Sequence, residues 1–443
     1  AAESPGAAGF RIVGDGAGSI VEVVGDVNGD GLDDILVKGP ADELYLVVPG
    51  KADGATVDLR ALAANDYPGM IQIRSTDNGS GGGTRAFHPG DVNGDGLADL
   101  LFYDKVGKGR AYVVFGRRGT RSVALDDLGN DGYRIVAGRK GREITATTGV
   151  GDVNGDGRGD VAVSDWLCNS SQTGCVWIVF GKDDPGQVDV DELGAGGYRI
   201  KGGESFDRLG GMLANLGDVN GDGIPDLAIG SHILPVHVVW GQRGFRDRTL
   251  VLKPGIFPGY TIDAGDAADP HDYDVEGGGD LNGDGLADLV IGDYYSLGNA
   301  AWVVYGKRTR QDVTLDTPGI GIRIDGPRDT RFGQALAFHR AASQTDLLVG
   351  AWLDDQDGLA DSGSVYRVDA DVPTPVTLVD DLRFTAEETR FVAAPSAQGP
   401  TLAFTALEPL KVRVAVLKLQ PGKRVGKQGR CVPGTPGKGQ QAC

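Results

Sequence analysis

Five segments of this chain carry oxygen-bearing side chains at the spacing of a loop that binds a hard cation. Each segment follows the pattern D-[VL]-N-G-D-G-x-x-D, and successive segments start 61 to 66 residues apart. Calcium takes about six to eight oxygen ligands, which side chains at alternate positions of a tight turn can supply. The expected ligands at positions 1, 3, 5, 7 and 9 are Asp26, Asn28, Asp30, Leu32 and Asp34; Asp91, Asn93, Asp95, Leu97 and Asp99; Asp152, Asn154, Asp156, Arg158 and Asp160; Asp218, Asn220, Asp222, Ile224 and Asp226; and Asp280, Asn282, Asp284, Leu286 and Asp288.

The variation within these loops favours calcium, with about five ions as the expected cofactor. Position 7 varies freely, which is expected if only its backbone carbonyl ligates, whereas position 9 is always Asp. The two glycines adopt a positive φ at little steric cost, so the chain can wrap around an ion. Magnesium fits less well because it tends to keep its waters. The alternative is a set of acidic turns without metal, and the regular repetition argues against it.

The residues around each loop predict short β-strands. Position 9 opens an apolar, β-branched run such as Asp160-Val-Ala-Val, which is typical of a buried strand. A second apolar run follows at 176–180 and its equivalents, then an element related to Gly-Tyr-Arg-Ile, and a fourth strand precedes each loop. Four short strands in each repeat of about sixty residues predict an all-β fold, a β-propeller.

The number of repeats favours six blades, although seven are possible. The run that starts at Asp346 aligns with the strands after the calcium loops, but residues 338–345 lack the carboxylates, so we expect a sixth blade without calcium. Six Gly-Tyr-Arg-Ile elements are present, and the first precedes blade one. We therefore expect the strand at 10–13 to complete blade six, which would remove exposed sheet edges.

These residues resemble the FG-GAP repeats of the integrin α-subunit headpiece and of many secreted bacterial proteins. The resemblance covers roughly residues 9–375 and is specific in the D-x-N-G-D-G loops. It implies a propeller with calcium on hairpins at one face and partner binding at the other. The chain departs from the family in having six rather than seven blades, and at the motif position that opens each repeat a literal Phe-Gly stands only at Phe332-Gly333. These departures argue against an integrin-like ligand but not against the propeller fold.

The chain is expected to divide into a propeller at residues 1–375 and a small C-terminal β-sandwich-like domain at 376–443. Beyond Val376 the repeat is lost, while alternating segments still indicate about four strands. The last residues are basic, in contrast to the acidic propeller. One interpretation is attachment to an anionic cell-wall polymer, and the alternative is a solvated tail.

Charge and cysteines indicate an extracellular protein that binds no nucleic acid. The formal net charge is −19, and five calcium ions would add +10 and leave −9. Much of the negative charge therefore belongs to predicted calcium ligands, and the remaining acidic surface argues against nucleic-acid binding. The cysteines form the close pairs Cys168/Cys175 and Cys431/Cys443, which predict loop-stapling disulfides and an oxidising compartment, with free thiols as the alternative. No apolar run is long enough to span a membrane, and a secreted or cell-surface monomer is expected.

Aromatic and imidazole side chains recur at the face opposite the calcium loops. Six residues after position 9, the chain carries Trp166, His232, Tyr294 and Trp352. Such rings suit a sugar or a protein partner, and packing between blades is the alternative. An acidic segment at 266–276 is a second candidate, for a metal or a carboxylate pair, although a solvated acidic loop is the favoured interpretation.

These patterns favour a calcium-stabilised binding or adhesion module for a glycan or an extracellular protein. The alternative is a propeller enzyme that acts on a polysaccharide with carboxylates of the ligand face. A third class is a structural part of a cell-surface assembly. The fold alone does not decide among them.

Overall fold

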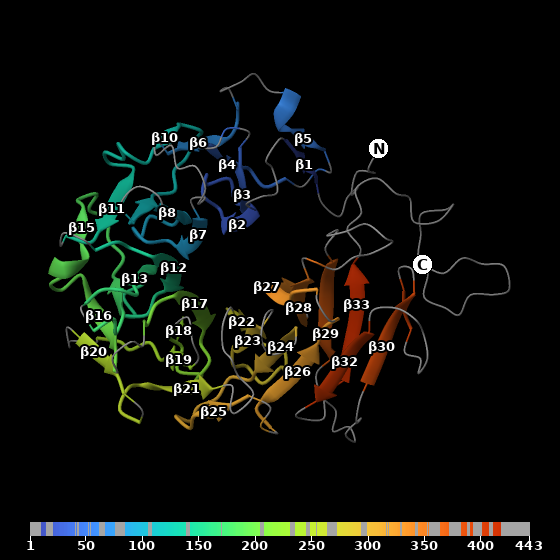
Figure 1. Cartoon of the computed structure of the whole chain (residues 1–443). Helices are drawn as coiled ribbons and strands as arrows, with labels where there is room; N and C mark the ends of the chain where they lie inside the picture. Colours follow the sequence, from blue (N-terminus) through green and yellow to red (C-terminus); the bar gives the residue numbers. More distant parts are fainter. Residues whose placement is uncertain are drawn as a thin grey trace.

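A computed structural model gives the fold of the chain. The structure describes residues 10–14, 21–39, 41, 44–51, 53, 55–61, 67–75, 85–104, 109–138, 142–169, 171–203, 208–230, 235–244, 249–253, 255–263, 273–293, 299–315, 317, 319–327, 330–341, 344–351, 353, 364–371, 382–387, 390–392, 401–406 and 411–417. Within these residues, six antiparallel sheets follow one another around a common centre (Figure 1). This arrangement confirms the predicted all-β, six-bladed propeller.

Four antiparallel strands make up each blade, and the first of them lies nearest the centre (Figure 1). Blade one contains β2 (Val21–Gly25), β3 (Asp34–Lys38), β4 (Leu44–Val48) and β6 (Ile71–Arg74). Blade two contains β7 (Arg85–Gly90), β8 (Asp99–Asp104), β9 (Arg110–Val114) and β11 (Gly132–Val136). Blade three contains β12 (Ala146–Gly151), β13 (Asp160–Asp165), β14 (Cys175–Val179) and β16 (Gly197–Gly202).

The remaining blades repeat this plan. Blade four contains β17 (Met212–Gly217), β18 (Asp226–Gly230), β19 (Val236–Val239) and β21 (Gly259–Asp263). Blade five contains β22 (Tyr273–Gly279), β23 (Asp288–Asp293), β24 (Ala300–Val304) and β26 (Gly321–Asp325). Blade six contains β27 (Phe332–Ala341), β28 (Gln344–Ala351) and β29 (Ser364–Asp371), with β33 (Lys411–Leu417) as its fourth strand.

The middle strands of a blade are buried on both faces. Every residue of β13 and of β14 is buried, because blade two packs on one face of this sheet and blade four on the other. Strands covered on both faces have nearly continuous apolar sequences rather than alternating ones. This explains why runs such as Cys-Val-Trp-Ile-Val are strands here and not segments of a helix.

A β-bulge precedes each of the five calcium-type loops. The register between the first and second strands shifts by one residue just before the loop, for example between Gly149 and Gly151 in blade three. Gly151 has a φ of 67°, in the left-handed region that favours glycine. The bulge bends the inner strand, and it places the loop at the end of the blade.

Short parallel strands tie blades one to five together in the described part of the chain. Four of them pair in parallel with the outer strand of the preceding blade: β10 (Val123–Ala124), β15 (Val188–Asp189), β20 (Thr249–Leu252) and β25 (Val313–Thr314). The equivalent strand of blade one, β5 (Val57–Asp58), pairs in the same way with β1 (Ile12–Val13). The N-terminal strand thus has the register of an outer strand.

The predicted completion of blade six by the N-terminal strand is wrong in this structure. The edge of β29 pairs with β33 from the C-terminal region, with Tyr366 opposite Val416. β1 instead packs on blade one, where Phe10 and Ile12 cover a core that includes Leu59 and Tyr67. The six matching elements gave the correct type of strand, and β1 makes the parallel contact with β5 that outer strands make with the next blade. The edge of β29 is nevertheless occupied by β33, a choice between strands that the local sequence does not specify.

The C-terminal region forms strands as predicted, but these strands join the propeller sheets. β32 (Thr401–Ala406) pairs with β26 of blade five, and β30 (Leu382–Glu387) and β31 (Arg390–Val392) extend that sheet outward. The boundary at residue 375 therefore stays a prediction. The tail beyond Leu417, with Cys431 and Cys443, lies outside the described residues.

Helical structure is minor. Two 3-10 turns are described, η2 (Leu59–Ala61) and η3 (Val190–Glu192), and each follows one of the short parallel strands. No helix in the described part of the chain has the length and hydrophobicity needed to cross a membrane.

Candidate metal centre

All five predicted loops lie at equivalent places, between the first and second strands of blades one to five. We call this side of the propeller the loop face. The Asp at position 9 is the first residue of the second strand, and it is completely buried in every blade. The loops themselves are mostly exposed at positions 4 to 6. The structure therefore joins a buried carboxylate to an accessible turn.

The Asp at position 1 organises the turn. In the first loop, Asp26 Oδ1 accepts hydrogen bonds from the backbone N–H groups of Gly29 and Asp30, and Oδ2 accepts one from Gly31, at 2.7 to 3.0 Å. The other four loops repeat these bonds. Gly29 and Gly31 have φ values of 79° and 88°, which let the N–H groups point inward.

Side chains at positions 3, 5 and 9 converge inside the turn. The Asn28 amide nitrogen lies 3.0 Å from Asp30 Oδ2 and 2.8 Å from Asp34 Oδ1. The position-5 carboxylate also accepts the N–H of position 7, as between Asp30 and Leu32 at 2.9 Å. The backbone N–H of Leu32 thus already donates a hydrogen bond within the loop. Its backbone carbonyl oxygen is the group predicted from the sequence to bind a calcium ion.

Burial raises the pKa of every Asp at position 9. The pKa reaches about 6 in Asp34, about 7 in Asp99 and Asp288, and about 8 in Asp160 and Asp226. Backbone hydrogen bonds partly counter the burial, as from Val27 and Gly50 to Asp34, while negative charge within the same loop opposes ionisation. A cation beside these carboxylates would favour their ionised form.

The donor set fits calcium in its chemistry. Each loop offers three carboxylates, one amide and one backbone carbonyl, all of them oxygen donors of the kind that calcium prefers. Among the described residues, no three His, Cys, Asp or Glu side chains already form a coordination set. The structure thus brings the predicted ligands into one turn without fixing a coordination geometry. When bound, calcium would supply positive charge to three neighbouring carboxylates.

The loops also form the joints between blades. The Ala98 N–H donates to the Asp26 carbonyl at 2.9 Å, and the Arg117 N–H donates to the Val27 carbonyl at 2.8 Å. Equivalent bonds join later blades, as from Gly159 to Asp91. Anything that orders positions 1 and 2 of a loop therefore also orders its contact with the following blade.

Blade six has an arginine where the other blades have an apolar side chain. Asp346, at the position-9 place, is fully buried, and its Oδ2 lies 2.7 Å from an Arg367 guanidinium nitrogen. Arg367 stands opposite Leu348, two residues after Asp346. The buried residues at this register in blades one to five are Val47, Val113, Ile178, Val238 and Val303. Sequence reasoning missed Arg367 because only strand register makes it equivalent to these valines and isoleucine.

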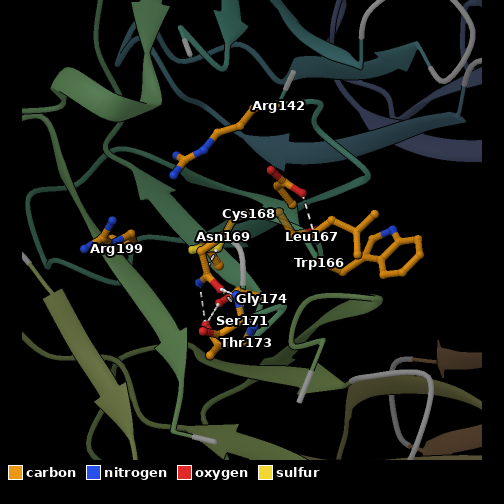
Figure 2. The surroundings of a disulfide bond; sticks show 12 residues. Arg142, Trp166, Leu167, Cys168, Asn169, Ser171, Thr173, Gly174 and Arg199 are labelled. Atoms are coloured by element: carbon orange, nitrogen blue, oxygen red, sulfur yellow. Dashed lines mark hydrogen bonds between the residues drawn. A yellow bond between two sulfur atoms is a disulfide. The ribbon is translucent and has the colours of Figure 1, made fainter. Parts of the chain in front are cut away.

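Trp166 is the predicted ligand residue that the structure describes on the opposite face. His232, Tyr294 and Trp352 lie outside the described residues. The Arg208 guanidinium lies 5.6 Å from the Trp166 ring centroid, a cation–π arrangement. The ring points away from the disulfide (Figure 2). Leu167, beside it, is 47% exposed.

The backbone around Trp166 is fixed by a disulfide and by two unusual residues. The predicted Cys168–Cys175 bond closes the connection between β13 and β14, with a Cα–Cα distance of 5.8 Å. Gln172 and Arg208 both have a positive φ, of 50° and 47°. The Arg208 N–H donates to the Gln172 carbonyl at 3.0 Å, and Arg208 Nε donates to Gln172 Oε1 at 3.2 Å. These bonds join blades three and four next to the partly exposed Trp166 ring.

The acidic segment is described only in part, since residues 264–272 lie outside the described ranges. Asp274 and Glu276 lie on β22, the inner strand of blade five. Burial, together with the charges of Asp274 and Glu22, raises the pKa of Glu276 to about 8. Glu22 on β2 was not expected from the sequence, although its place between two valines on an inner strand is a usable signal.

The chain is similar to curated proteins over part of its length. No family model matches the chain. It is 30% identical over 224 residues to phosphatidylinositol-glycan-specific phospholipase D of Rattus norvegicus, covering 45% of this chain and 25% of that protein. It is 32% identical over 161 residues to integrin alpha-PS2 of Drosophila melanogaster, covering 32% of this chain and 11% of that protein. With integrin alpha pat-2 of Caenorhabditis briggsae, identity is 29% over 240 residues, covering 47% and 17%.

A solved structure titled BBS1N in complex with ARL6DN, soaked with mercury, has a TM-score of 0.31 at 9% identity, covering 78% of this chain and 91% of that one. This likeness is too low to support a fold assignment, which therefore rests on the strand topology described above. The chain spans about a quarter or less of the curated relatives it matches. The predicted resemblance to integrin α chains is confirmed at this level. The similarity to phosphatidylinositol-glycan-specific phospholipase D was not predicted.

Proposed function

We propose that this chain is an extracellular, calcium-stabilised propeller that binds a glycan or a protein partner. Similarity to integrin α chains fits a binding or adhesion module in general terms. The observation that carries the proposal is the pairing of two faces: five buried-carboxylate loops on one side, and a rigidly held Trp166 on the other.

Calcium is assigned a structural role in this proposal. Each loop holds three predicted acidic ligands and shares backbone hydrogen bonds with the next blade. Neutralising these carboxylates would stabilise the turn and, through positions 1 and 2, the joint between blades. The ion would thus maintain the relative position of the blades, and with it the surface that spans blades three and four.

Trp166 is assigned to the ligand surface. Trp and Arg are the residue types that most often dominate binding energy at interfaces. Here the ring is partly exposed, Arg208 stacks over it, and the disulfide limits movement of the connection that carries it. A surface that is ordered before binding loses less conformational entropy when a partner binds.

The proposal is tested by screening the protein against arrays of glycans and of extracellular protein domains, with calcium and with a chelator. The variant Trp166→Ala should weaken binding to the partner found by about 10- to 100-fold, the cost of losing an aromatic anchor. The matched control is Ile256→Ala, which removes an apolar side chain that is 72% exposed on another connection. Equal binding by Trp166→Ala and wild type would overturn the assignment of this face.

A further inference from the structure

Three arginines recur at one place on the loop face. Arg118, Arg243 and Arg308 each stand two residues after the glycine that follows the third strand of blades two, four and five. All three side chains are exposed. Since the third strand ends on the loop face, this register brings each arginine next to the calcium-type loop of the preceding blade.

Each arginine side chain packs against the glycine at position 4 of that loop. A Cβ atom placed on Gly29 would lie 3.1 Å from Arg118 Cγ, and one on Gly155 would lie 2.8 Å from Arg243 Cγ. A Cβ atom on Gly221 would lie 2.8 Å from an Arg308 guanidinium nitrogen. The side chains therefore rest on the backbone of the neighbouring loop.

These guanidinium groups have no partner among the described residues, since none of the three enters a hydrogen bond or an ion pair there. The cations next to them in sequence differ: Arg117 pairs with Asp131, and Lys307 lies 3.9 Å from the Tyr260 ring centroid. Blade three has Asp183 at the equivalent position, and its carboxylate lies 3.4 Å from Arg158. The unpaired arginines are thus a repeated feature of blades two, four and five.

The charge beside each arginine depends on calcium. A loop with three ionised carboxylates carries −3, and one bound calcium ion changes this to −1. Without the ion, the loop repels an approaching anion and attracts the guanidinium itself. With the ion, the guanidinium is available to a carboxylate or sulfate group, which arginine binds with two parallel hydrogen bonds.

We propose that Arg118, Arg243 and Arg308 form a calcium-dependent binding site for an anionic polysaccharide that carries sulfate or carboxylate groups. Repeated anionic groups along one polymer match cations repeated from blade to blade. A lipid surface fits less well, because the apolar side chains at position 7 are mostly covered: Leu97, Ile224 and Leu286 are 7 to 9% exposed. The site goes beyond the proposed function and is independent of Trp166, which lies on the other face.

The test measures binding to immobilised dextran sulfate, with uncharged dextran as the control polymer, at about 0.15 M salt where exposed charges are screened beyond roughly 8 Å. The variant Arg118→Gln/Arg243→Gln/Arg308→Gln should bind at least about 10-fold more weakly than wild type. The charge control is Arg60→Gln/Arg121→Gln, whose guanidinium groups already pair with Asp58 and Asp131, and it should bind nearly as wild type does. Calcium content should stay unchanged in both variants.

Three results would overturn the proposal. They are no binding of wild type to dextran sulfate, equal loss in the triple variant and the charge control, and arginine-dependent binding to phosphatidylserine vesicles without binding to the polymer. The variant Trp166→Ala separates this site from the proposed function. If chelator abolishes polymer binding while Trp166→Ala retains it, the arginine site stands even where the Trp166 surface fails.

Discussion

The Arg367 guanidinium lies 2.7 Å from the Asp346 carboxylate, which is fully buried in blade six. Asp346 stands where the five other blades have the last acidic residue of a calcium-type loop, and Arg367 stands where they have Val or Ile. The chain thus provides its own positive charge in the one repeat whose preceding residues lack the acidic ligands. This relationship explains how a blade without calcium retains a buried carboxylate.

Replacing Arg367 by valine, the residue most common at this register, should destabilise the protein. The substitution leaves Asp346 buried without a counter-charge, which costs about 2 kcal/mol, below the 3–5 kcal/mol of a fully buried pair because the Arg367 side chain is 39% exposed. Thermal melts with calcium and with chelator should show the same loss. Adding Asp346→Asn should restore part of the stability, and a melt of Arg367→Val equal to that of wild type would contradict this role.

Deleting residues 1–14 should destabilise blade one and leave blade six intact. Phe10 and Ile12 cover an apolar core of blade one, and their partial burial is worth about 2 kcal/mol. Hydrogen exchange should become faster in β5 and η2, against which β1 packs. Faster exchange confined to β29 would instead show that the N-terminal strand completes blade six.

His237 should make part of the stability depend on pH. Burial lowers the pKa of its imidazole from 6.5 to about 4, so the unfolded chain binds a proton that the folded chain does not between these values. Its contribution is present above pH 6.5 and is lost as the pH falls toward 4, by up to about 3 kcal/mol. In saturating calcium, His237→Leu should show a flatter dependence of unfolding free energy over this range, and an unchanged slope would exclude this cause.

The sequence was sufficient to predict features that depend on residues close together in the chain. Position 9 opens a buried strand in each blade because Asp160 and its equivalents precede β-branched residues that pack between sheets. Partners across the fold were less predictable. The element at Phe10 matches the outer strands, yet β33 and not β1 pairs with the edge of β29. Arg367 occurs in a strand whose alternation looks ordinary. Both depend on which strands are adjacent, and local periodicity does not specify that.

The individual loops should each account for one ion. Asp156→Ala removes the position-5 carboxylate of the third loop and should reduce the calcium content by one, as counted by native mass spectrometry. Gln344→Ala, at the equivalent region of blade six, is the matched control and should change nothing. Retention of all ions by Asp156→Ala would show that this loop does not hold calcium through the predicted side chains.

The most direct test of the account is thermal unfolding in saturating calcium and in excess chelator, together with the number of ions bound. The account predicts about five calcium ions per chain. A free ion concentration of 100 times the dissociation constant contributes about 2.7 kcal/mol for each independent site, so the melting temperature should fall by many degrees on chelation and recover when calcium is restored. An unchanged melting temperature in chelator, with no calcium bound at saturation, would contradict the account.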